Sequence, residues 1–194
     1  SMVARSLSCA GASSARWAKV RRCLRKISIV LSMAASLTSA LTFSISAALG
    51  GAKRVITVDI AAPALEDAKE IFRINGVDPG AHGFEAVDAF AWPGPKSDLV
   101  IVDPPSLTKG KAADGAARLA YKSLHRHVTD YATDLVATAS CTARLPWERW
   151  EEAVREGLGG TWSSLHRSAE PVDHPVAMGH PEGRYLKFML LGRL

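Results

Sequence analysis

Three residues with reactive or strongly polar side chains directly follow short apolar runs of the sequence. Asp59 follows "RVITV", Asp103 follows "DLVIV" and Cys141 follows "DLVATAS". A carboxylate at the end of a strand can accept hydrogen bonds from both hydroxyl groups of a ribose. A thiol becomes a nucleophile once it has lost its proton. These residue types therefore suggest a site that holds a nucleoside beside a thiol.

Each of these residues also has a plain structural explanation. Asp59 can cap a helix or close a turn, and the same holds for Asp88, which lies near the end of another apolar run and could otherwise meet an adenine amino group. Free cysteines are often simply small buried side chains. For Cys141 we expect instead that nearby Arg144 and loop amides stabilise a thiolate in part. The residues by themselves leave both explanations open.

Two prolines, Pro104 and Pro105, follow Asp103. Proline fixes φ, lacks an N–H donor and keeps the preceding residue out of the helical region, so the next helix cannot begin at once. We expect a rigid ledge that holds the Asp103 carboxylate and backbone carbonyls where a planar base can be positioned. A plain turn of the same composition is the alternative.

The elements that must position these residues alternate between strands and helices. Short apolar runs predict strands over residues 54–60, 84–90, 97–103, 134–141 and 184–194, and helical spacing predicts helices over 64–76, 111–131 and 146–160. Unbroken apolar strands that alternate with helices are typical of a parallel sheet covered on both faces. The sequence predicts an α/β fold with a doubly wound, mostly parallel sheet, in which ligands bind beyond the carboxyl ends of the strands.

The totals describe an ordinary globular chain. It has 194 residues, of which 47% are hydrophobic and 22% charged, and a net charge of +5 that comes largely from residues 16–26. Such a basic segment can bind nucleic acid or an anionic membrane, or serve solubility alone. The three cysteines show no CxxC pairing, so we expect no metal site and no disulfide framework. A reducing cytoplasm fits best.

Residues 27–52 carry no charge and follow the basic segment, which is also the outline of a signal peptide or a membrane anchor. Serine and threonine dilute this run throughout, unlike a spanning helix. We therefore expect a buried strand, loop and helix, and no membrane association. A membrane-tethered or exported protein remains an alternative.

From about Ser44 onward the chain resembles a class I S-adenosylmethionine-dependent methyltransferase. More narrowly, it is similar to the bacterial ribosomal RNA large-subunit methyltransferase I family, which makes 5-methylcytosine. The similar segments are "AALGGAKRVITVDI", "LVIVDPPSLTKGK", "YKSLHRH", "ATASCTARL" and "DHPVAMGHPEGRYLK". The "DPP" motif occurs in many nucleic-acid methyltransferases, whereas the last segment is much more specific.

The resemblance implies a Rossmann-like fold with an antiparallel C-terminal strand and an S-adenosylmethionine cofactor across the strand ends. It implies an RNA partner and no metal. Asp59 and the neighbouring Ile60 would hold the ribose, Asp88 the adenine, and Asp103 with Pro104 the methionine end. The resemblance also implies that Cys141 adds to carbon 6 of cytosine as the catalytic nucleophile, with Asp103 hydrogen-bonded to the base.

The sequence departs from the family pattern in the loop after the first strand, at residues 131–134, where "YATD" replaces a Gly-Gly turn, and at the N-terminus. The family has an aromatic-Thr-Gly-Gly loop after its first strand, and the corresponding stretch here, residues 36–44, reads "SLTSALTFS". Residues 1–35 match no RNA-binding region of the family, so we expect a basic segment over 1–35, which need not be part of the core fold, and a methyltransferase domain over 36–194. The alternative function is a catalytically impaired remnant that binds nucleic acid. The oligomeric state is not readable.

Overall fold

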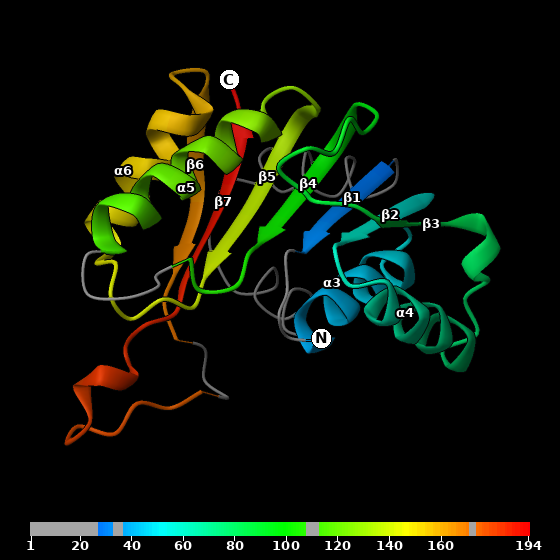
Figure 1. Cartoon of the computed structure of the whole chain (residues 1–194), viewed down its shortest axis with the longest axis horizontal. Helices are drawn as coiled ribbons and strands as arrows, with labels where there is room; N and C mark the ends of the chain where they lie inside the picture. Colours follow the sequence, from blue (N-terminus) through cyan, green and yellow to red (C-terminus); the bar gives the residue numbers. More distant parts are fainter. Residues whose placement is uncertain (1–26, 33–36, 108–112, 171–173) are drawn as a thin grey trace.

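The structure is a computed structural model, and it describes residues 27–32, 37–107, 113–170 and 174–194. Within these ranges seven strands form one sheet in the order β3-β2-β1-β4-β5-β7-β6 (Figure 1). The strands are β1 (Ile27–Ser32), β2 (Arg54–Asp59), β3 (Gly83–Ala86), β4 (Ser97–Asp103), β5 (Ala132–Ser140), β6 (Trp162–Ser168) and β7 (Lys187–Arg193). Neighbouring strands from β3 through β5 are parallel, and β7 runs antiparallel to both β5 and β6. The prediction of a mostly parallel sheet with an antiparallel C-terminal strand is therefore confirmed.

Four α-helices connect the strands in the described part of the chain. They are α3 (Leu37–Leu49), α4 (Ala62–Ile74), α5 (Ala113–Val128) and α6 (Trp147–Leu158), with short 3₁₀ turns η1 (Pro79–Ala81) and η2 (Pro181–Gly183). In Figure 1, α5 and α6 lie beside one another, and α3 and α4 form a second pair near β2 and β3. The parallel pairs that follow one another in the chain, β1–β2, β2–β3 and β4–β5, thus each have the helical crossover that their geometry requires.

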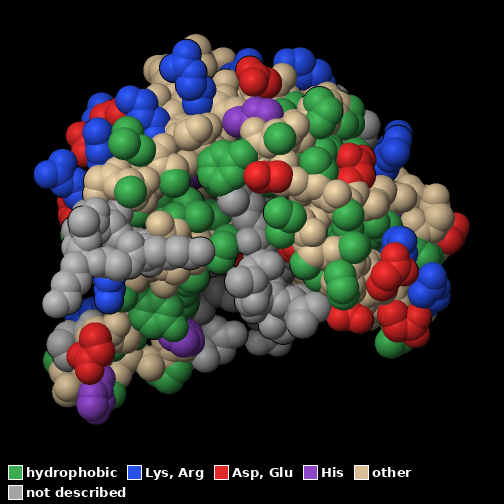
Figure 2. Space-filling view, in the orientation of Figure 1, with side chains coloured by type: hydrophobic (Ala, Val, Ile, Leu, Met, Phe, Trp, Pro, Cys, Tyr) green, Lys and Arg blue, Asp and Glu red, His purple; other side chains and the backbone are tan. Residues whose placement is uncertain are grey.

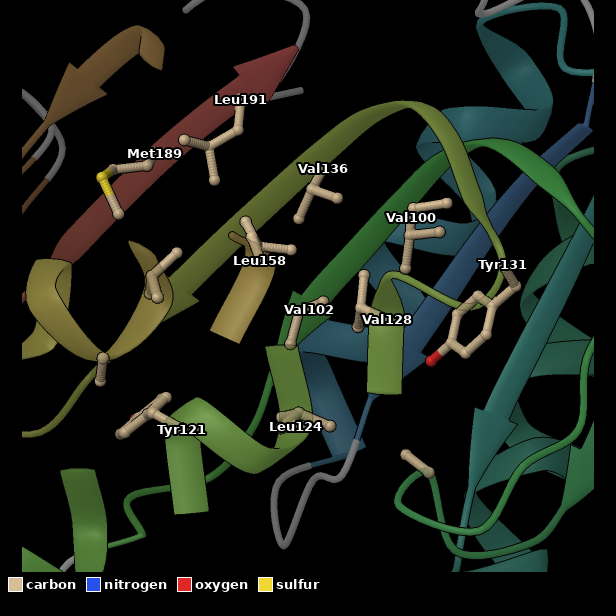
Figure 3. Close-up of a cluster of buried hydrophobic side chains, with 14 of the residues drawn as sticks. Val100, Val102, Tyr121, Leu124, Val128, Tyr131, Val136, Leu158, Met189 and Leu191 are labelled. Atoms are coloured by element: carbon tan, nitrogen blue, oxygen red, sulfur yellow. The ribbon is translucent and has the colours of Figure 1, made fainter. Parts of the chain in front are cut away.

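The strands alternate between two buried clusters because successive side chains point to opposite faces of the sheet. In β4, Val100 and Val102 belong to the larger cluster under α5 and α6, while Leu99 and Ile101 belong to the cluster on the α3 face. Figure 3 shows the larger cluster, where Tyr121 and Leu124 of α5 lie close to the strand side chains. Burial on both faces explains why the predicted strands read as continuous apolar runs.

The topology brings the carboxyl ends of the parallel strands to one edge, called here the carboxyl rim. The chain order reverses between β1 and β4, where Ser32 pairs with Asp103. On one side Asp59 pairs with Ala86 at the end of β3. Because β7 is antiparallel, its first residue, Lys187, also lies at this rim, opposite the last residue of β5. A point of reversal is the usual place for a ligand in an open α/β sheet.

The described residues within 27–52 include the strand and the helix that we expected, β1 and α3. The stretch 36–44 is not a loop: from Leu37 it is the start of α3, and the connection between β1 and α3 falls on 33–36, outside the described residues. β1 precedes the expected domain start at residue 36, and it is paired with both β2 and β4. The basic segment 16–26 lies outside the described residues.

Candidate active site

Cys141 lies on a tight turn directly after β5. The hydroxyl oxygen of Ser140 accepts a hydrogen bond from the backbone N–H of Thr142 at 3.3 Å. The ammonium group of Lys187 donates to the carbonyl oxygen of Thr142 at 2.7 Å. Cys141 itself is a free, exposed cysteine. The residues on either side of the thiol are therefore held from two directions, while the thiol faces solvent at the carboxyl rim.

The charges around the thiol differ from what the sequence suggests. Partial burial raises the pKa of Cys141, and the nearby Asp103 carboxylate raises it further. Backbone hydrogen bonds from Cys141 and Ser106 lower the pKa, as does the positive charge of Lys187. Loop amides do stabilise the thiolate as expected, but the cation that acts on it is Lys187 rather than Arg144. The net direction is upward, so the resting group is held as a thiol.

Two buried side chains of helix α5, Tyr121 and His125, hydrogen-bond residues of β5 close to Cys141. The Tyr121 hydroxyl hydrogen-bonds the Ser140 hydroxyl at 2.9 Å. Burial raises the pKa of Tyr121 to about 12, and the negative charges of Cys141 and Asp103 act in the same direction. One turn along α5, His125 bonds the Tyr121 carbonyl at 2.7 Å and the Thr138 hydroxyl at 2.9 Å. Because a carbonyl only accepts, Nδ1 of His125 carries the proton and Nε2 accepts from Thr138.

We predict that His125 makes stability depend on pH. Burial lowers the pKa of His125 from 6.5 to about 4, so the unfolded chain binds a proton there at a higher pH than the folded protein does. The stabilisation is complete above pH 6.5 and is lost as the pH falls toward 4. Between pH 7 and pH 5 the free energy of unfolding should fall by about 2 kcal/mol from this group, as measured by urea denaturation.

The matched variant for this prediction is His125→Gln, which keeps a polar side chain on the same turn of α5. Its free energy of unfolding should change less with pH over the same interval, although it is lower at pH 7. Partly buried His82, whose pKa is also lowered, remains in both proteins and cancels in the comparison. Equal pH slopes for the two proteins would contradict the assignment.

A second group of predicted residues gathers at the ends of β2 and β3. The Asp59 carboxylate is buried and its Oδ1 accepts a hydrogen bond from the Ala61 N–H at 2.8 Å. The Asp59 carbonyl accepts from the N–H of Val87 at 3.2 Å, which ties the two strand ends together. Ile60 is 70% exposed, and Asp88 is exposed with its Oδ1 bonded to the Phe90 N–H at 2.9 Å. A buried acid therefore lies beside an exposed apolar side chain and an exposed acid.

Asp103 ends β4 between these two groups. Pro104 is buried directly after it, and residues 104–107 form no helix. The next described helix begins at Ala113, as the two prolines predict. Asp59 at the end of β2 and Cys141 after β5 are three strand spacings apart in the sheet order, which is about 14 Å. The predicted residues therefore lie along one rim, with Asp103 near its middle.

Sequence reasoning assigned no role to Tyr121, Ser140 or Lys187. Tyr121 and Lys187 do occur in the segments "YKSLHRH" and "PEGRYLK". The available signal for Lys187 was its position: a lysine that begins an antiparallel last strand must lie at the carboxyl rim.

Two further findings concern the described residues as a set. They contain no group of three or more His, Cys, Asp or Glu side chains placed to hold a metal ion. Across the same ranges, the helices are all too short or too polar to cross a lipid bilayer.

The chain is similar to known proteins over most of its length. Residues 13–172 match the family model described as S-adenosylmethionine-dependent methyltransferase. The chain is 36% identical over 160 residues to a ribosomal RNA large subunit methyltransferase of Deinococcus radiodurans, covering 77% of this chain and 39% of the relative. It is 32% identical over 157 residues to ribosomal RNA large subunit methyltransferase I of Alteromonas mediterranea, covering 75% and 40%. The chain thus spans about 40% of the length of these curated relatives.

A solved methyltransferase in complex with S-adenosylhomocysteine has a similar structure. The TM-score is 0.73 at 22% identity, over 90% of this chain and 48% of the other. This similarity shows the fold, and the family model together with the relatives shows which family the chain belongs to. The chain belongs to the S-adenosylmethionine-dependent methyltransferase family.

Proposed function

We propose that this protein methylates RNA at carbon 5 of a cytosine, with Cys141 as the nucleophile. One observation carries the proposal: the Cys141 thiol and the Asp103 carboxylate, from the ends of adjacent strands, are close enough for the carboxylate charge to raise the pKa of the thiol. A pyrimidine held by Asp103 would therefore lie within reach of the sulfur.

The family's cofactor is S-adenosylmethionine, and the residues at the rim suit it in type and order. A ribose needs a carboxylate at the end of β2, which Asp59 supplies. An adenine needs an apolar surface and a hydrogen-bond acceptor, which exposed Ile60 and Asp88 supply. Asp59 is only 1% exposed, so its carboxylate must become accessible for a ribose to bind. Asp103 and Pro104 then lie toward the methionine end.

A thiol is useful in this reaction because carbon 5 of cytosine is a poor nucleophile. S-adenosylmethionine supplies an electrophilic methyl group on a sulfonium. In the proposal, the Cys141 thiolate forms a bond to carbon 6 of the ring, which makes carbon 5 electron-rich. Asp103 accepts a hydrogen bond from the cytosine amino group and so orients the ring. Carbon 5 would then take the methyl group, with S-adenosylhomocysteine as the leaving group. A base would remove the carbon 5 proton as the carbon–sulfur bond breaks, which restores the thiolate.

RNA is proposed as the substrate because both curated relatives carry names of ribosomal RNA methyltransferases. The base must leave its stack to meet the rim, since an atom of a stacked base is not accessible to a thiol. The segment between β6 and β7 projects from the same end of the molecule as the strand ends (Figure 1). Its exposed side chains include His174, Met178, His180 and Arg184, which suit contact with an unpaired nucleotide and its phosphates.

The test is methyl transfer from labelled S-adenosylmethionine to large-subunit ribosomal RNA that lacks modification, followed by nucleoside analysis. The expected product is 5-methylcytidine. Label on a nitrogen or on ribose oxygen would overturn the carbon-5 assignment. Absence of heat on titration with millimolar S-adenosylmethionine would overturn the proposed function as a whole.

A further inference from the structure

Lys187 is an unusual residue for the place that it occupies. It is only 6% exposed, and burial lowers its pKa. Its ammonium group donates to the carbonyl oxygen of Thr142 at 2.7 Å and to that of Tyr185 at 2.9 Å. The negative charges of Glu170 and Cys141 raise its pKa in opposition to burial. The cation therefore connects three parts of the chain: the thiol turn, the segment before β7 and the segment after β6.

Packing alone does not explain a lysine at this position. Removing an ammonium group from water costs free energy unless hydrogen bonds and opposite charge compensate. Here the compensating groups are two backbone carbonyls and two side chains that can be anionic. An apolar residue would fill the same space without that cost, so the retained charge needs another explanation.

We infer that Lys187 is a positioning residue for the Cys141 thiol, fixing the turn that carries it through Thr142 and supplying the positive charge that a thiolate requires. The inference rests on the proposed function of Cys141 as nucleophile. Asp103 from β4 disfavours ionisation of this thiol, while Lys187 and the Ser106 amide favour it. Tyr121 of α5 also interacts with it electrostatically. When a cytosine engages Asp103, the opposing charge is partly neutralised, and Lys187 then governs the ionisation of the thiol.

The bond to Tyr185 gives Lys187 a second consequence. Tyr185 belongs to the segment between β6 and β7, where its hydroxyl contacts His174 at 3.3 Å and the two rings pack edge to face. A hydrogen bond joins the two ends of this segment: the Glu170 carboxylate accepts from the Leu186 N–H at 3.2 Å. Figure 2 shows histidine side chains exposed on this projection at the lower left. Lys187 thus places the thiol relative to the surface that we propose meets RNA.

The test measures the thiol directly, without methyl transfer. Iodoacetamide alkylation of Cys141 is followed by mass spectrometry from pH 6 to pH 10 in Lys187→Gln, Lys187→Arg and the parent protein. Lys187→Gln should be alkylated about fivefold more slowly at pH 8, because removing the cation lowers the thiolate fraction. Lys187→Arg keeps the charge and should lie close to the parent. Lys69→Gln, which removes a lysine paired with Glu66 on α4, should have no effect.

Coincident alkylation profiles for Lys187→Gln and the parent would overturn the inference, whether or not RNA is methylated. If Lys187→Gln does not fold, an NMR titration of the Lys187 side chain decides the matter in folded proteins. Charge coupling is reciprocal, so Cys141→Ser should lower the pKa of Lys187 relative to the parent. An unchanged Lys187 titration would overturn the inference. Methyl transfer that survives in Cys141→Ala would refute the proposed nucleophile instead, so the two failures are distinguishable.

Discussion

Cys141→Ala is expected to abolish methylation of RNA while leaving the binding of S-adenosylmethionine unchanged. The substitution removes the sulfur that would activate carbon 5, and the rate should fall by at least about 10³-fold. Asp59, Ile60 and Asp88 lie on the other side of β1 from the thiol, so the cofactor keeps its contacts. Single-turnover transfer of labelled methyl groups gives the rate, and calorimetry gives the cofactor dissociation constant.

The matched control uses the other two cysteines. Cys9 and Cys23 lie outside the described residues and have no role in the proposed reaction, so the double variant Cys9→Ala/Cys23→Ala should keep the parent's rate. A trapping experiment reports on the covalent bond itself. RNA with 5-fluorocytidine at the target cannot lose its carbon 5 substituent as a proton, so the adduct should persist on a denaturing gel. The adduct should be absent with Cys141→Ala.

Full activity of Cys141→Ala would contradict the covalent mechanism. The site would then fit a methyltransferase for a nitrogen or oxygen atom, because such atoms carry lone pairs and need no thiol adduct. Asp103 and the two prolines would keep the same place in that reaction. The change would therefore revise the target atom and leave the cofactor assignment intact.

The location of the site was predictable from the sequence because parallel strands share one carboxyl edge. Asp59, Asp103 and Cys141 each end an apolar run, and a sheet with continuous buried strands leaves few other places for them. The prolines after Asp103 likewise predicted that no helix begins there, and the next described helix starts ten residues later, at Ala113.

The electrostatics of the thiol were not predictable in the same way. Sequence proximity pointed to Arg144 as the stabilising cation, whereas the cation that acts on Cys141 is Lys187, on β7. Contacts across the sheet depend on strand order. After β5 the chain forms β6 at the edge of the sheet, and β7 then lies between β5 and β6. The Asp103 charge that opposes ionisation comes from the neighbouring strand for the same reason.

For the uncharged stretch 27–52, the sequence predicted the types of element but not where the helix begins. Composition argued correctly for a strand and a helix, but comparison with the family pattern assigned residues 36–44 to a loop. The structure forms α3 from Leu37, since residues 37–49 contain neither glycine nor proline to interrupt a helix.

Asp59→Asn is expected to weaken the binding of S-adenosylmethionine by about 30-fold to 100-fold, which corresponds to about 2–3 kcal/mol. A ribose donates from two hydroxyl groups, and hydrogen bonds to a carboxylate are roughly twice as strong as those to a neutral amide oxygen. Asparagine has the same shape and can keep the acceptor for the Ala61 N–H, which Asp59 bonds at 2.8 Å. The loss should therefore appear in cofactor binding rather than in folding. Calorimetry with S-adenosylmethionine and with S-adenosylhomocysteine should give the same factor, since the two share the ribose.

Asp88→Asn is the matched control, because it makes the same change on an exposed acid whose Oδ1 accepts from the Phe90 N–H. An asparagine oxygen can keep that bond, and an adenine amino group can donate to an amide as well as to a carboxylate, so the loss should be only about threefold. Thermal melting should place both variants within a few degrees of the parent. If Asp59→Asn binds the cofactor within threefold of the parent while folding normally, the buried acid at the end of β2 serves only to join β2 to the turn at Ala61. The ribose would then have to be held elsewhere along the rim.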